Sequence, residues 1–176
     1  MDRKEGGRKI PSRESGEFEI FVGSDWAQMG KVNNAILDYL TSHELSDELA
    51  NRYTMVACEL TENGIKYGSF EMDGDFVRVR IRLDGGSISV EVTNPVGEDT
   101  RAYLSELDQT IQWIRGFQDP FEAYIERMRA ISREPLEIDR SGLGLVRITY
   151  EGRSALDFFV EEDSTLSVSA VSELNR

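Results

Sequence analysis

The sequence predicts an α+β fold, a two-layer α/β sandwich in which helices cover one face of a single sheet. Three observations predict it. Apolar and polar side chains alternate in short segments near both ends of the chain, which is typical of half-buried strands. Between them, apolar residues recur every three or four positions, which is typical of helices. The resulting order is strand, helix, helix, hairpin, helices, short helix and hairpin, so we expect a mixed, mostly antiparallel sheet.

Length and charge limit the number of domains and the classes of partner that we expect. The 176 residues are enough for one domain with a substantial core. Residues 1–15 are rich in Arg, Lys, Gly and Ser and have no apolar period, so we expect a disordered basic tail before a folded domain over 16–176. The net charge of -13 disfavours nucleic acid and anionic lipid as partners and suits a basic protein surface.

Other features indicate a cytoplasmic protein. No apolar segment approaches the ~18 residues of a membrane span, and the N-terminus lacks the apolar core of a signal peptide. The single cysteine, Cys58, fits a reducing compartment and a passive thiol in mid-helix. With one histidine, His43, in a polar run, we expect no cysteine–histidine site, no serine–histidine triad and no zinc cluster.

The elements of the first half have recognisable starts. Residues 17–22 alternate and predict the first strand. A helix with an apolar stripe follows, capped by Ser24 or Asp25. Ser46 or Asp47 caps a second, central helix.

A β-hairpin is predicted around the tight turn Asp84-Gly85-Gly86. Three arginines point to one face of its first strand: Arg78, Arg80 and Arg82. Such a row fits either a nucleic-acid surface or an ion-paired face with partners such as Glu91 on the second strand. The acidic composition favours the ion-paired face.

Residues 101–132 predict two helices inserted between the halves of the sheet. Apolar residues keep a heptad-like period on both sides of Asp119-Pro120, which marks the start of the second helix. This spacing is typical of core packing or of a dimer seam. Trp113, Ile114 and Phe117 would suit a homodimer if they were exposed.

The end of the central helix carries side chains suited to chemistry. Glu59 and Asn63 are four residues apart, so they lie one above the other at the edge of the apolar stripe. There they can face a cleft and offer a base together with a neutral oxygen ligand for a hard cation such as magnesium. The alternative is structural: Gly64 caps the helix end, and Glu59 and Glu62 are solvated.

A second stretch, the glycine turn (Gly142-Leu143-Gly144), precedes the short helix. Glycines at a helix start leave backbone N–H groups accessible, and the helix dipole adds positive potential, so the arrangement can bind phosphate. The alternative is a tight packing turn. The stretch is neither a P-loop nor a Rossmann fingerprint, because the P-loop lysine motif is absent and no strand directly precedes it.

Together the two stretches resemble the motifs of the GHKL (Bergerat-fold) ATPase superfamily. Residues 59–68, ELTENGIKYG, resemble its N-box, which in the switch-kinase branch typically reads E-L-x-x-N-A-x-x-H-G. Residues 141–146, SGLGLV, resemble its second glycine box. The helical insert, in the position of the ATP lid, looks most like the SiaB-type protein kinases, relatives of the RsbW and SpoIIAB anti-sigma kinases of partner-switching systems. The resemblance spans about residues 17–172.

The resemblance implies a site and its ligands. Glu59 would be the general base that takes a proton from a Ser or Thr hydroxyl of a partner. Asn63 would ligate Mg²⁺ bridging the phosphates of ATP, and Lys66 would approach phosphate oxygens. Backbone N–H groups of the glycine turn would hold the phosphates: Gly142, Leu143 and Gly144. The implied function is an Mg-ATP-binding, serine/threonine kinase-like regulator of a small partner of the anti-sigma-antagonist type.

The sequence departs from the superfamily in three places. The first glycine box, D-x-G-x-G, is altered, because the corresponding strand ends at Asn94, which offers an adenine amino group a carbonyl oxygen but no charge. Apolar helices replace the usual flexible lid, and Tyr67 stands where His is common. These departures indicate an alternative, a degenerate, non-catalytic GHKL-fold module that sequesters its partner.

Overall fold

The computed structural model describes residues 16–97, 100–133, 142–161 and 164–174. The tail predicted at 1–15 lies outside the described residues. In chain order the elements are β1 (Gly16–Val22), the 3-10 turn η1 (Trp26–Gln28), α1 (Met29–Ser42), α2 (Asp47–Tyr67), β2 (Val77–Asp84), β3 (Ser87–Pro95), α3 (Arg101–Arg115), α4 (Pro120–Arg133), α5 (Leu143–Tyr150), β4 (Ala155–Val160) and β5 (Thr165–Glu173).

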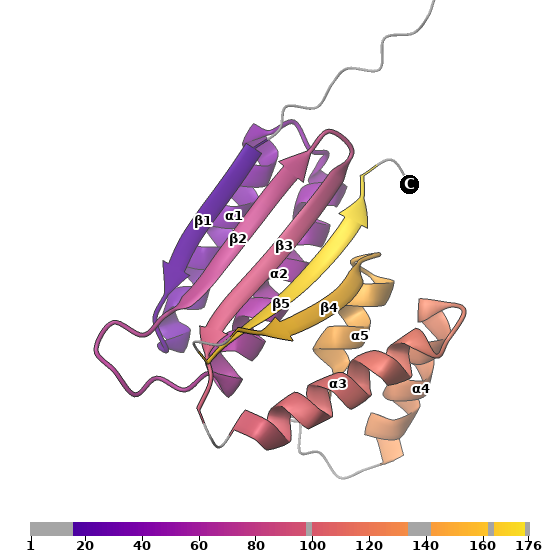
Figure 1. Ribbon diagram of the computed structural model, residues 1–176. Coiled ribbons are helices and arrows are strands. Elements are labelled where there is room, and N and C mark those ends of the chain that lie inside the picture. Colours follow the sequence, from indigo (N-terminus) through magenta and orange to yellow (C-terminus); the bar gives the residue numbers. More distant parts are fainter. Residues whose placement is uncertain (1–15, 98–99, 134–141, 162–163, 175–176) are drawn as a thin grey trace, which may run out of the picture.

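The five strands form one sheet in the spatial order β1-β2-β3-β5-β4, and each neighbouring pair is antiparallel (Figure 1). The predicted two-layer α+β class is confirmed, but the prediction of a mixed sheet is wrong. The reason is that β5, the second strand of the last hairpin, pairs with β3 and runs antiparallel to it. Had β4 taken that place, its pairing with β3 would have been parallel.

The core lies between the sheet and the helices behind it. Helices α1 and α2 lie side by side on one face, and α5 lies near β4 (Figure 1). Val77, Val79 and Ile81 of β2 point inward, toward the apolar stripe of α2. In that stripe Tyr53 is 1% exposed and Val56 is fully buried. At about 1.5–3 kcal/mol for each large buried side chain, this packing holds α2, and the residues it carries, in one position.

Gly64 lies inside α2, so the interpretation of this glycine as a helix cap is wrong. The helix continues to Tyr67, and Gly68 occupies the cap position. A Cβ on Gly64 would lie 3.1 Å from methyl groups of both Val77 and Val92. Glycine therefore lets α2 approach the sheet closely at the point where the N-box lies.

The starts of the helices agree with the capping residues predicted from the sequence. The Ser46 hydroxyl caps α2. Asp25 caps η1, the short turn that leads into α1. The Asp119 carboxylate accepts a hydrogen bond from the N–H of Phe121 at 2.9 Å, and Pro120 begins α4, as predicted.

The outer face of the sheet is ion-paired. The Arg80 guanidinium lies 2.9 Å from a carboxylate oxygen of Glu19, 3.3 Å from Glu17 and 3.8 Å from Glu91. Arg82 lies 3.5 Å from Glu17, whereas Arg78 donates a hydrogen bond to the hydroxyl of Thr93 at 3.5 Å. The predicted ion-paired face is thus confirmed for Arg80 and Arg82, and each exposed pair contributes about 0–1 kcal/mol.

Helices α3 and α4 form the predicted insert, and α4 packs against α5 (Figure 1). Leu107 and Ile114 of α3 are buried, whereas Trp113 is 39% exposed, so the residues predicted for a homodimer do not share one exposed face. Arg115 donates a hydrogen bond to the carbonyl oxygen of Leu156 at 2.7 Å and ties α3 to β4. In the described part of the chain, no helix is long and apolar enough to cross a membrane.

Candidate functional site

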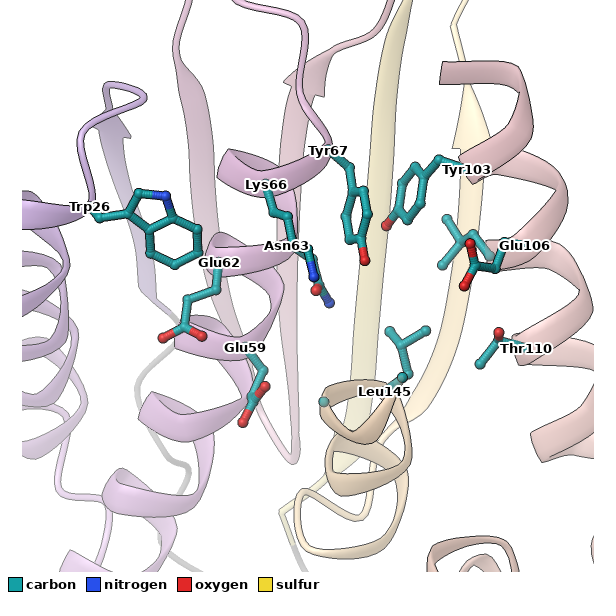
Figure 2. A pocket seen from close by; sticks show the side chains of 13 residues that line it. Trp26, Glu59, Glu62, Asn63, Lys66, Tyr67, Tyr103, Glu106, Thr110 and Leu145 are labelled. Atoms are coloured by element: carbon teal, nitrogen blue, oxygen red, sulfur yellow. The ribbon is translucent and has the colours of Figure 1, made fainter. Parts of the chain in front are cut away.

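A cavity of about 330 Å³, here called the N-box cavity, opens where α2, α3 and the start of α5 meet (Figure 2). Its lining residues are Trp26, Glu59, Glu62, Asn63, Lys66, Tyr67, Tyr103, Glu106, Leu107, Thr110, Gly142, Gly144 and Leu145. The cavity brings together these residues predicted from two distant stretches: Glu59, Asn63, Lys66, Gly142 and Gly144.

One wall of the cavity is the C-terminal half of α2. Glu59, Asn63 and Lys66 follow one another at intervals of four and three residues, so they form a row on one side of the helix. Figure 2 shows Glu59 and Asn63 on successive turns of this wall, with Tyr67 beyond them. Leu60, on the same helix, is buried in the core and fixes the rotation of the row toward the cavity.

The Glu59 carboxylate connects the two predicted stretches. Its Oε1 accepts a hydrogen bond from Nη1 of Arg147 on α5, within an ion pair. Its Oε2 lies against Gly144, because a Cβ on that glycine would be only 2.5 Å from this oxygen. Gly144 therefore has a steric reason to be glycine: a side chain there would displace the carboxylate.

The surroundings of Glu59 perturb its acidity. Burial raises the pKa of the Glu59 carboxyl, the Arg147 guanidinium opposes that rise, and the nearby carboxylates Glu62 and Glu151 add to it, so the pKa lies above its ordinary value. Arg147 is itself held by Glu151, with Nε 3.1 Å from Oε1 and Nη2 3.3 Å from Oε2. A partly buried carboxyl with a perturbed pKa in a cavity is typical of functional sites.

The glycine turn forms a second wall. Gly142 precedes α5 with φ of +59°, a left-handed conformation that glycine adopts without strain. The positive end of the α5 dipole lies beside the cavity, which Gly142 and Gly144 line. Leu143 packs against the core instead of lining the cavity, which Leu145 lines in its place. Arg127 of α4 lies close by, since a Cβ on Gly142 would be 3.1 Å from its Nη2.

Two stacked tyrosines, not assigned to the site from the sequence, line the cavity between α2 and α3. The rings of Tyr67 and Tyr103 are nearly parallel, with centroids 3.8 Å apart and an interplanar angle of 9° (Figure 2). Burial raises the pKa of Tyr103, so its hydroxyl stays protonated at neutral pH. Lys66 Nζ lies 5.0 Å from the centroid of the Tyr67 ring, within cation–π distance.

Arg147 was also not predicted as a site residue, although its spacing in the sequence indicates a helical ion pair. It is the one cationic residue of α5 and precedes Glu151 by four positions, the spacing of a helical ion pair. Trp26 and Tyr103 had weaker signals, because neither belongs to an apolar period that singles it out.

Asn94 is not among the residues that line the cavity. It is 2% exposed at the end of β3, and its amide nitrogen donates to the carbonyl oxygen of Pro95 at 3.1 Å. Its side-chain oxygen faces α2, where a Cβ on Gly64 would be 3.5 Å away. Asn94 is therefore not positioned to contact an adenine bound in this cavity, as its expected role would require.

The sequence matches no protein-family model and no curated protein. Among solved structures, it is similar to a chain of the SiaB–SiaC complex from Pseudomonas aeruginosa, with 21% sequence identity, a TM-score of 0.66 and coverage of 88% of each chain. The chain therefore has the same kind of fold as that chain. The resemblance inferred from the N-box and the second glycine box is confirmed at this level, and the likeness concerns the fold alone.

Proposed function

We propose that this protein is an Mg-ATP-dependent, serine/threonine kinase-like regulator that acts on a small protein partner of the anti-sigma-antagonist type. One observation carries the proposal: residues of the N-box and the glycine turn, far apart in the chain, line one cavity. The SiaB-like fold supports it, because the similar structure is a complex of SiaB with a second protein, SiaC.

The residues of the cavity fit a magnesium–triphosphate better than a bare triphosphate. Three carboxylates, Glu59, Glu62 and Glu106, line it together with Lys66. A bare triphosphate would meet like charges there, whereas bound magnesium neutralises part of its charge. The Asn63 amide oxygen would hold the metal, because hard cations prefer oxygen ligands. Lys66 and the N–H groups of the glycine turn would hold phosphate oxygens.

Glu59 would act on the partner's hydroxyl. Mg-ATP supplies the phosphoryl group when it is bound. The hydroxyl oxygen bonds to the terminal phosphorus, the bond from that phosphorus to the ADP oxygen breaks, and Glu59 receives the hydroxyl proton. This role requires an ionised carboxylate within about 2.6–3.2 Å of the hydroxyl, and the ion pair with Arg147 favours the ionised form.

Thermal unfolding with and without Mg-ATP tests the proposal. Ligand at 100 times its dissociation constant stabilises by about 2.7 kcal/mol, which for a chain of this size is roughly 5–10 °C in Tm. Asn63→Ala should abolish the shift, whereas Asn51→Ala, an exposed asparagine on the same helix, should keep it. Glu59→Gln should keep the shift but lower the rate of transfer of radiolabelled phosphate to the partner by about 100- to 10,000-fold. Full transfer by Glu59→Gln would remove the assigned base.

A non-catalytic module that sequesters its partner is the second candidate. The observation that favours it is that Asn94 lies outside the cavity lining while Tyr67 and Tyr103 stack against each other within it. For this function, partner binding should be independent of nucleotide. No thermal shift at millimolar Mg-ATP, together with intact partner binding in Asn63→Ala, would decide for this candidate.

A further inference from the structure

Arg147 holds the Glu59 carboxylate from a different helix. Its guanidinium makes a two-point contact with Glu151, the C-cap residue of α5, and its remaining Nη1 donates a hydrogen bond to Oε1 of Glu59. Because the guanidinium is a planar fork, fixing two of its nitrogens on Glu151 also fixes the direction of the third. The position of α5 thereby determines the orientation of the Glu59 side chain on α2.

The contact is less exposed to solvent than an ordinary surface ion pair. The side chain of Glu59 is 20% exposed and that of Arg147 is 34% exposed, so both charges are partly removed from water. Two like charges act against Glu59: Glu62 on α2 and Glu151, the C-cap residue of α5. Without Arg147, repulsion from Glu151 would favour movement of the carboxylate away from the end of α5.

Gly144 completes the arrangement. With Oε1 bound to Arg147, Oε2 occupies the space that a Cβ on Gly144 would take. Both oxygens are therefore restrained by α5, one by a hydrogen bond and one by close packing. The carboxylate is held beside the turn where the phosphates of the proposed substrate would bind.

We propose that Arg147 is a positioning residue for phosphoryl transfer, which orients the Glu59 carboxylate beside the glycine turn without binding nucleotide itself. The proposal rests on the proposed kinase function. Arg147 does not line the N-box cavity, so its effect on a substrate passes through Glu59. A residue of this kind changes the rate of transfer and leaves nucleotide affinity nearly unchanged.

The test compares Arg147→Met, Arg147→Lys, Glu59→Gln and the double variant Arg147→Met/Glu59→Gln in the full chain, with the partner as phosphate acceptor. Arg147→Met should lower kcat about 100-fold, the effect of a misplacement of about 1 Å, with the KM for ATP within about twofold. Arg147→Lys should recover part of kcat. The double variant should be no slower than Glu59→Gln alone. Arg129→Met, an exposed helical ion-pair arginine, is the control and should keep full activity.

Several outcomes would overturn the role of Arg147. A higher KM with unchanged kcat would show that it binds nucleotide directly. Losses that multiply in the double variant would show that it acts independently of Glu59. Urea unfolding of the wild type, Arg147→Met, Glu59→Gln and the double variant without nucleotide provides a readout separate from activity. The shifts in midpoint caused by the changes at 59 and 147 should be non-additive, and additive shifts would contradict the contact. If no variant and no wild-type chain transfers phosphate, the kinase proposal fails as well, whereas equal transfer by wild type and Arg147→Met removes only the positioning role.

Discussion

Gly144→Ala should separate function from folding. A Cβ at this position would lie 2.5 Å from Oε2 of Glu59, 3.5 Å from its Cδ and 3.9 Å from its Cβ. Real Cβ contacts shorter than 3.0 Å are essentially absent, so the oxygen must retreat by at least 0.5 Å, the difference between 3.0 and 2.5 Å. The retreat is cheap, because the oxygen ends a flexible side chain, and alanine favours the helix by about 0.5–1 kcal/mol. We therefore expect the free energy of unfolding to change by less than about 1 kcal/mol.

The effect on phosphate transfer should be much larger. The displaced carboxylate loses its alignment with Arg147. Because a misplacement of about 1 Å costs about 100-fold in rate, a retreat of at least 0.5 Å should lower the rate by about 10- to 100-fold, or raise the barrier by about 1.4–2.7 kcal/mol. The assay pairs urea unfolding with transfer of radiolabelled phosphate. Retention of full transfer by Gly144→Ala would refute the reasoning.

Two other glycines calibrate the stability measurement. At Gly152 a Cβ would lie 2.5 Å from Cγ2 of Val56 and closer still to the carbonyl oxygen of Ile148, a backbone atom that cannot rotate away. Gly152→Ala should therefore lower the free energy of unfolding by about 1–3 kcal/mol or more. Gly30 lies in α1 with nothing within 4 Å of its would-be Cβ, so Gly30→Ala should raise stability by about 0.5–1 kcal/mol. A loss at Gly144→Ala as large as that at Gly152→Ala would contradict the prediction.

Two further predictions concern pH and the tyrosine stack. Because the pKa of Glu59 is raised in the folded chain, the folded state binds its proton more tightly than the unfolded state does; the contribution of Glu59 to stability should fall as pH rises from about 4.3 through the raised value. Urea unfolding over a pH series should show that Glu59→Gln removes this part of the slope, and an unchanged slope would contradict the assignment. Tyr103→Ala should lower the free energy of unfolding by roughly 1–3 kcal/mol, because it removes a stacked, partly buried ring, whereas Tyr103→Phe should cost less than about 1 kcal/mol. Equal losses in the two variants would show that the hydroxyl, and not the stack, is what matters.

Local patterns were sufficient to predict α2 and its functional row. Glu59 and Asn63 are four residues apart on a helix whose apolar stripe is continuous, so their common direction follows from helical geometry alone. Gly64 was ambiguous at this level, since Asn-Gly commonly ends a helix. Its actual role depends on Val77 and Val92, which belong to strands that only the fold brings beneath it.

The missed features all depend on contacts between distant segments. Arg147 and Tyr103 reach the site because α5 and α3 pack beside α2. The apolar periodicity within α5 or α3 does not indicate that α2 is the neighbouring helix. The position of Asn94 beneath Gly64 likewise follows from how β3 passes under α2. The direction of β5 in the sheet could not be read from its alternation, because parallel and antiparallel strands share the same period of two.

The two glycines of the glycine turn have different physical roles, and this difference bears on function. Gly142 is required by its left-handed backbone, whereas Gly144 is required by the carboxylate of Glu59. Placing that carboxylate in a partly buried position raises its pKa, which destabilises the ionised folded state, and Arg147 offsets only part of this effect. A module that only docks a partner does not need a partly buried carboxyl with a raised pKa. An apolar residue would be buried at that place with a smaller free-energy cost. A kinase does gain from it, because an oriented carboxylate is the group that its proton transfer needs. The arrangement around Glu59 thus supports our proposal of phosphoryl transfer more than the alternative of sequestration.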